Sequence, residues 1–310
     1  MTHAPIILAT KPFTGTPGPL AVAQWLAVRE GRPLRLVCVL DPFEEAGIYK
    51  GSLRVPRYVE EECEWIAKRI DSALHESPYA RLDTQVEVVD GSVPGTLERL
   101  AHEEHASLLV MGSGHRGGIN GPLAQQVLRT ARIPLLIVPA DATARPLMRA
   151  VAAIDFTAPS IRAAAEVLPL LASDGRLTLC HVRPPSGGVD SEPRSTDAYL
   201  TACAEAFGSL IRALPLQPGI SVDTIVLEGD VAACIDNFAT MHRADILACG
   251  RRAPDAPQAQ LLGSVSAGIV RQARIPVLVS PDMSASKHVA FEWAATAMAG
   301  AGHASNTTAG

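Results

Sequence analysis

The feature that most constrains this chain is an internal repeat. Residues 131–139 (ARIPLLIVP) recur almost unchanged as residues 273–281 (ARIPVLVSP), at a displacement of 142 positions. Upstream the match continues at a displacement of 138, so that Gly91 corresponds to Gly229 and the apolar positions that follow correspond as well. A fixed period with a copied apolar pattern indicates one structural unit written twice.

The change of displacement locates the main difference between the two copies. It requires four extra residues in the second copy, within residues 250–263, where the first copy has residues 112–121. Loops positioned by a rigid scaffold commonly carry function. We therefore expect the functional difference between the copies to lie in this loop.

Each copy alternates short apolar runs with longer segments of helical spacing. The expected strands are residues 6–10, 34–40, 84–89, 107–111 and 135–138 in the first copy, and 150–154, 177–182, 221–227, 245–249 and 277–280 in the second. Such alternation predicts βαβ units, and so an α/β fold whose mainly parallel sheets carry helices on both faces. We expect domains at 1–140 and 149–283, joined by a linker at 141–149, and a low-complexity tail at 284–310.

Composition narrows the class of function. The chain has 310 residues, 47% of them hydrophobic, with a net charge of -5 and a pI near 6.0. It lacks a basic patch with interleaved aromatics, so we expect no nucleic acid partner. We also expect no membrane span and no secretion signal, and hence a cytoplasmic protein. The six cysteines form no C-x-x-C pair, which favours reduced, mostly buried thiols over a disulfide framework.

The candidate ligand site of the second copy lies at strand ends. In parallel sheets, ligands bind outside the carboxyl ends of the strands and near helix N-termini, whose amides attract anions. The alternative is purely structural, in which the glycines end strands, Ser264 caps a helix and the arginines are solvated. The candidate residues are Asp155, Phe156 and Thr157 at the end of the first strand, Val182 at the end of the second, Gly250, Arg251, Arg252 and Ala253 at the end of the fourth, and Gly263, Ser264 and Val265 where the next helix opens.

With its strands, spacing and repeat, the second copy resembles the universal stress protein family. Nucleotide-binding members of that family carry G-x-x-G, nine residues, then G-[S/T]. Here Gly250, Gly263 and Ser264 match this motif, whereas Ala253 stands in place of the second glycine. The resemblance also matches Asp155 to an aspartate on the adenine or ribose side, and Val182 to a position bordering adenine.

The resemblance implies two tandem flavodoxin-like (adenine nucleotide α-hydrolase-like) domains, each with a five-stranded parallel sheet. It implies binding of ATP or a related adenine nucleotide, with or without Mg²⁺, mainly in the second domain. It also implies pairing of the last strands, so that the halves form an internal pseudo-dimer; a homodimer remains open. An enzyme that hydrolyses or transfers the nucleotide, and a ligand-free scaffold favoured if Ala253 abolishes binding, are the alternatives.

The first copy is expected to be mainly structural. It has Lys11-Pro12 where the second copy has its acid, and Pro122 replaces the motif's hydroxyl residue at the helix start. The alternative is that His115 and Arg116, among several glycines, bind a different anion.

Two weaker patterns are interpreted as structural. The fingerprint formed by Gly112, Gly114 and Gly117 follows the fourth strand rather than the first, which argues against a Rossmann dehydrogenase. Residues 102–105 (HEEH) lack the i, i+4 histidine spacing of zinc sites and are expected to form a solvated helix face.

His181 stands where the family often has histidine, and a structural role is as good an explanation as ligand binding.

Overall fold

The computed structural model describes residues 4–10, 17–40, 56–75, 79, 81–113, 122–183, 196–251 and 264–282. The chain divides into two compact units between Pro146 and Leu147, with residues 270–278 grouped with the first unit.

The first half of the chain is a parallel five-stranded sheet in the order β3-β2-β1-β4-β5. Its strands are β1 (Ile6–Thr10), β2 (Leu34–Leu40), β3 (Thr84–Asp90), β4 (Leu108–Gly112) and β5 (Leu135–Val138). Its helices are α1 (Pro17–Glu30), α3 (Pro56–His75), α4 (Val93–Glu103) and α5 (Pro122–Thr130).

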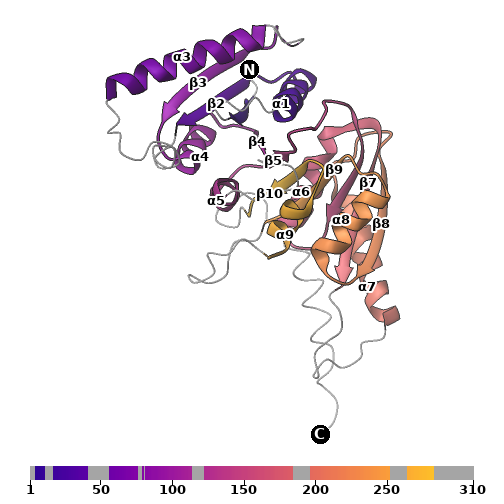
Figure 1. Ribbon diagram of the computed structural model, residues 1–310. Helices are drawn as coiled ribbons and strands as arrows, with labels where there is room; N and C mark the ends of the chain where they lie inside the picture. The colour runs from indigo at the N-terminus through magenta and orange to yellow at the C-terminus, as the bar shows by residue number, and fades with distance from the viewer. Residues whose placement is uncertain are drawn as a thin grey trace. The chain divides into compact units, whose positions relative to one another are not determined.

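The second half repeats this architecture in the order β10-β9-β6-β7-β8. Its strands are β6 (Leu147–Ala153), β7 (Leu171–Arg183), β8 (Ser221–Glu228), β9 (Ile246–Gly250) and β10 (Val277–Ser280). Its helices are α6 (Ala158–Val167), α7 (Thr196–Ala213), α8 (Val231–Met241) and α9 (Ser264–Gln272), with a 3-10 turn at Leu168–Leu170. Within this half, α8 packs beside β7 and α7 beside β8 (Figure 1).

The strand order reverses once in each sheet, at β1 and at β6. Because crossover connections between parallel strands are right-handed, a reversal of direction places successive helices on opposite faces of the sheet. The reversal also opens a crevice at the carboxyl ends of the flanking strands, where ligands of such folds bind. The predicted fold class, two tandem flavodoxin-like α/β units, is confirmed.

Local chemistry explains where α8 begins. Gly229 has φ +141°, a conformation that favours glycine, and it occupies the turn after β8. Asp230 then caps the helix, since its carboxylate accepts the amide of Ala233 at 2.9 Å. Gly91, with φ +146°, makes the corresponding turn in the first half.

The predicted strands 6–10, 34–40, 135–138 and 277–280 have the observed bounds, and most others differ by a few residues at their ends. The largest difference is β7, which begins at Leu171 instead of residue 177. Polar Ser173, Asp174 and Gly175 hide this extension in the sequence, because they interrupt the apolar run that predicts a buried strand.

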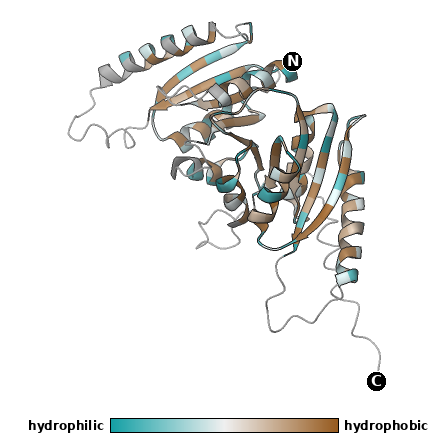
Figure 2. Cartoon of the chain, turned by 45° about the vertical axis from the view of Figure 1, so that its right-hand side comes forward, coloured by the Kyte–Doolittle hydropathy of each residue, from teal (hydrophilic) through white to brown (hydrophobic). Residues whose placement is uncertain are grey.

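Apolar residues gather along the strands, as Figure 2 shows. Ile6, Leu34, Leu177 and Ile246 have no exposed surface. Among the described helices, none is long and apolar enough to cross a membrane. All six cysteines lie in described segments, where none forms a disulfide; four of them are buried, in line with the expectation of mostly buried thiols.

Candidate functional site

A cavity of about 330 Å³ opens in the second unit at the carboxyl ends of β6, β7 and β9. This is the point where the strand order reverses, and the volume lies at the low end of the usual range for small-molecule sites. Side chains from these strands, from the turn after β6 and from α8 and α9 line it: Ala153, Ile154, Asp155, Ser160, Cys180, His181, Val182, Val231, Ile235, Cys249, Gly250, Val265 and Ser266.

The floor of the cavity is a row of three small side chains on adjacent strands. Ala153 of β6 pairs with Cys180 of β7 on one side and with Cys249 of β9 on the other. Paired residues of parallel strands point to the same face of the sheet. Burial raises the pKa of each thiol to about 12, with the neighbouring Cys234 and Asp155 adding smaller effects on Cys180 and Cys249 respectively. Both thiols are therefore uncharged at neutral pH, and the floor is neutral and mostly apolar.

Asp155 lies at the rim of this cavity, in the turn between β6 and α6. Its Oδ1 accepts hydrogen bonds from the backbone amide of Thr157, at 3.0 Å, and from the Thr157 hydroxyl. Its own amide donates to Oγ of Ser160 at 3.3 Å, and that hydroxyl donates to the Thr157 carbonyl at 2.9 Å. The turn thus holds an exposed carboxylate at a fixed place beside an apolar cavity.

Phe156, the next residue, has φ +61°, which a side chain with a Cβ adopts only at a cost. Its ring is 6% exposed and packs against His181 and Phe207, with ring centroids 5.0 and 5.1 Å away. The buried ring offsets the backbone cost and anchors the turn.

Gly250 ends β9 where β9 meets α6. A Cβ added there would lie 2.4 Å from the carbonyl carbon of Pro159 and 2.4 Å from the amide nitrogen of Ser160. The glycine is therefore required by packing of β9 against the start of α6. The sequence analysis placed Gly250 in the candidate ligand site, and its structural alternative, a glycine that ends a strand, agrees with this packing role.

The structure brings four of the predicted site residues to the cavity: Asp155, Val182, Gly250 and Val265. Phe156 and Thr157 support the turn without lining the cavity. Arg251 follows β9 and its amide donates to the Ser280 carbonyl at 2.8 Å. Ser264 is the first residue of α9, whereas Arg252, Ala253 and Gly263 lie outside the described residues.

Sequence reasoning missed several lining residues, chiefly Ser160, Cys180, Cys249 and Ser266. Both cysteines lie in apolar runs. The apolar pattern of a buried strand does not distinguish a residue that faces the core from one that faces a cavity. Strand register is the property that separates them, and register is set by pairing with distant segments.

In the first unit, Lys11, Pro12 and residues 114–121 lie outside the described residues, so the candidate anion site at His115 and Arg116 does too. The helix α5 begins at Pro122, as the sequence suggested.

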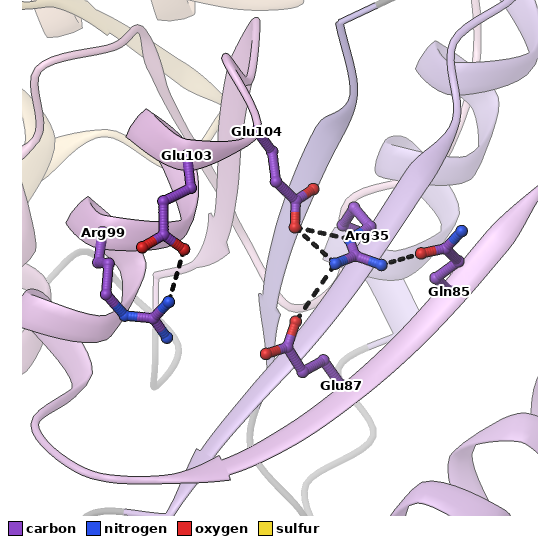
Figure 3. A network of polar contacts seen from close by, with 6 residues as sticks. All are labelled: Arg35, Gln85, Glu87, Arg99, Glu103 and Glu104. Atoms are coloured by element: carbon purple, nitrogen blue, oxygen red, sulfur yellow. Dashed lines mark hydrogen bonds and ion pairs between the residues drawn. The ribbon is translucent and has the colours of Figure 1, made fainter. Parts of the chain in front are cut away.

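The HEEH segment at the end of α4 is engaged in ion pairs. Arg35 on β2 reaches Glu104 at 2.5 Å and Glu87 on β3 at 3.4 Å, and it also donates to Gln85 (Figure 3). Glu103 pairs with Arg99 one turn earlier at 2.6 Å. Glu104 is thus half-buried and joins the helix to the sheet, which differs from the fully solvated face that the sequence suggested. Within the described ranges, no group of three His, Cys, Asp or Glu side chains could hold a metal ion.

Comparisons with known proteins agree with this fold. A universal stress protein from Archaeoglobus fulgidus is 18% identical, with a TM-score of 0.65 over 90% of this chain and 99% of its own. A functionally unknown protein from Pseudomonas aeruginosa is 15% identical, with a TM-score of 0.60 over 97% of this chain and 98% of its own. At these identities the likeness supports the fold alone. No curated protein matches the sequence significantly.

The family assignment rests on sequence. The family model described as the universal stress protein family matches twice, over residues 5–139 and again over residues 147–281. Each match spans one of the two sheets, and together they cover most of the chain. The chain therefore belongs to the universal stress protein family, as a member with two tandem copies.

Proposed function

We propose that the second unit binds an adenine nucleotide, ATP or a close relative, in the cavity between β6, β7 and β9. One observation carries the proposal: a neutral cavity at the strand-order reversal has a carboxylate on its rim and a helix N-terminus on its wall. Adenine is flat and apolar on its faces, which suits a floor of Ala153, Cys180 and Cys249. Asp155 would accept hydrogen bonds from ribose hydroxyls.

The phosphates would extend toward the start of α9. Helix N-termini bind anions because their first amides have no partner within the helix. The loop carrying Arg251, Arg252 and Ala253, with Gly263 and Ser264 at its end, is the proposed phosphate cradle. Asymmetric binding, with one nucleotide per chain in the second domain, follows from the missing acid and the Pro122 of the first copy.

Calorimetry with ATP, ADP and AMP, each with and without Mg²⁺, tests this function. Asp155→Asn should weaken binding about tenfold or more, the size of a hydrogen bond to a charged group. Asp174→Asn is a matched control, because Asp174 is an exposed acid of β7 away from the cavity lining. Absence of binding by all three nucleotides would favour the ligand-free scaffold instead.

We propose further that occupancy, rather than a product, is the output. Phosphoryl transfer needs carboxylates that position a metal or a nucleophile, and Asp155 lies at the base and ribose end of the proposed ligand. A steady-state assay with ATP and Mg²⁺ decides between this and the hydrolase or nucleotidyl transferase alternative. Turnover in the usual enzyme range of about 1 to 10³ s⁻¹, lost in Ser264→Ala, would establish the enzyme.

An internal pseudo-dimer of the two halves through residues 135–138 and 277–280 is also proposed, because these are the most alike segments of the repeat and are short apolar strands. Small-angle scattering that fits two separate, freely tumbling lobes would argue against it. Whether two chains also form a homodimer is measured by light scattering. Residence in the cytoplasm stays a prediction that cell fractionation tests.

A further inference from the structure

His181 connects the turn that carries Asp155 to a helix on the outside of the sheet. Its Nδ1 lies 2.7 Å from the carbonyl oxygen of Ile154, the residue immediately before Asp155. Its Nε2 lies 2.6 Å from the hydroxyl of Tyr199 on α7. The imidazole therefore bridges β6 and α7.

The chemistry of the partners fixes the direction of both hydrogen bonds. A carbonyl oxygen only accepts, so Nδ1 carries the proton and donates to Ile154. In the neutral ring Nε2 is then the acceptor, and Tyr199 donates to it. Burial, together with the Cys203 thiol, raises the pKa of Tyr199 against the opposing charge of Arg183, so the phenol keeps its proton.

The bridge continues the sheet beyond its last backbone pair. The amide of Ile154 donates to the Cys180 carbonyl at 2.8 Å, the normal ladder bond of β6 and β7. The Ile154 carbonyl is instead taken by the His181 side chain. Both polar groups of Ile154 are thus held by β7, and the chain enters the Asp155 turn from a fixed position.

The same helix holds the turn through a second, apolar contact. Phe156, at φ +61°, packs in tilted geometry against both His181 and Phe207, and Phe207 belongs to α7 like Tyr199. The Arg183 guanidinium lies over the Tyr199 ring, 4.9 Å from its centroid. Two side chains of α7 therefore act on the residues that flank Asp155: Tyr199 on Ile154 through His181, and Phe207 on Phe156 directly.

We propose that His181, Tyr199 and Phe156 form a relay through which the position of α7 sets the placement of Asp155 in the ligand cavity. The role proposed for His181 is to position the turn; because His181 also lines the cavity, this role is measured on the turn without nucleotide. This inference rests on the proposed nucleotide site for its ligand, and it adds a route by which α7 and nucleotide occupancy control one another. By linkage, whatever shifts α7 changes nucleotide affinity, and nucleotide changes the ordering of α7 by the same factor.

The test deletes single groups from the relay. Tyr199→Phe removes only the hydroxyl and leaves the ring packed on Arg183. His181→Asn keeps a donor near the Nδ1 position but does not reach α7. Thr201→Val is the matched control, because it removes a hydroxyl from α7 that bonds within the helix, to the Asp197 carbonyl at 2.8 Å.

The first readout needs no nucleotide: hydrogen exchange of the Asp155 and Thr157 amides, both bonded to side chains of the turn. Tyr199→Phe and His181→Asn should speed their exchange about three- to tenfold, the effect of one net hydrogen bond, while Thr201→Val leaves it unchanged. Nitrogen-15 shifts of His181 should report the Nδ1-protonated tautomer. Unchanged exchange in the turn, or equal acceleration throughout the second unit, would overturn the relay.

The second readout is a double-mutant cycle for ATP binding with Tyr199→Phe and Asp155→Asn. If Tyr199 acts through Asp155, the two losses are not additive, whereas a general loss of stability gives additive effects and refutes the relay. The two hypotheses can fail separately. If the wild type binds no adenine nucleotide but Tyr199→Phe and His181→Asn still speed exchange of the turn amides, the proposed function is disproved and the relay stands.

Discussion

Glu166, near the end of α6, is a partly buried acid whose replacement by glutamine should change how stability depends on pH. Its Oε2 and the Oγ of Ser280 on β10 are both buried, and neither forms a hydrogen bond within the described parts of the chain. Burial raises the pKa of Glu166 from 4.5 to about 7, against the opposing positive charge of the Arg162 guanidinium. Between these two values the folded protein binds a proton that the unfolded chain has lost.

The direction and size of the pH effect on stability follow from the difference between the folded and unfolded pKa values of Glu166. Because the folded state prefers the protonated acid, its stability is full below pH 4.5 and falls as the pH rises to about 7. Each pKa unit corresponds to about 1.36 kcal/mol, so the loss is roughly 3 kcal/mol above pH 7. Glu166→Gln carries no charge at any pH. The variant should exceed the wild type by only about 1 kcal/mol at pH 5 and by about 3 kcal/mol at pH 8.

The measurement is urea unfolding by circular dichroism at pH 5, 6, 7 and 8, supported by hydrogen exchange in peptides from α6 and β10. The quantity to compare is the difference in free energy of unfolding between variant and wild type at each pH. The titration of all other groups contributes equally to both proteins and cancels in this difference. Glu205→Gln, an exposed change on α7, controls for the loss of one negative charge. A difference that is flat across this pH range would refute the reasoning.

Three further predictions concern glycines. Gly250→Ala should lower stability by about 1 to 3 kcal/mol and weaken ATP binding, because its Cβ would meet backbone atoms of Pro159 and Ser160 at 2.4 Å; unchanged thermal unfolding would contradict this. Gly208→Ala should raise stability by about 0.5 to 1 kcal/mol, since it lies inside α7 and its Cβ would meet only the flexible end of Arg212, at 3.5 Å; a lower melting temperature would count against it. Gly263→Val should abolish ATP binding while Gly121→Val leaves it unchanged, and calorimetry showing two equivalent sites per chain would disprove the asymmetry.

Much of the fold could be predicted because the apolar pattern of a short segment is enough to indicate a strand there. Residues 135–138 form an uninterrupted apolar run, residues 34–40 are apolar except for Arg35, and each segment is a strand with those bounds. Asp155 and Val182 could be placed at the site for the same reason, since both follow directly from where a strand ends. The internal repeat then supplied the topology, because a pattern valid for one copy had to hold for the other.

The rest depends on contacts between distant segments. The positive φ of Phe156 is stabilised by His181 and Phe207, which lie far along the chain, so no local pattern announces it. The requirement for glycine at position 250 also comes from a distant segment, because its close neighbour is the start of α6. The raised pKa of Glu166 likewise reflects burial against β10, which the sequence of α6 alone does not contain.

The two copies differ at the cavity floor as well as in the loop. In the second unit, Ala153 is flanked by Cys180 and Cys249. In the first, the corresponding alanine of β1, Ala9, is flanked by the larger Val37 and Met111.

This difference predicts that Cys249→Met gives the second unit the side chain that the first unit has at the same register position. The longer side chain would occupy the space proposed for adenine, so ATP affinity should fall at least about tenfold, the effect of losing one well-placed apolar contact surface. Stability should hold or rise, because methionine is flexible enough to fill an existing cavity. Calorimetry and thermal unfolding measure the two effects, with Cys63→Met on α3 as the control for replacing a cysteine elsewhere. Unchanged ATP affinity in a folded Cys249→Met protein would show that the base does not lie on this floor.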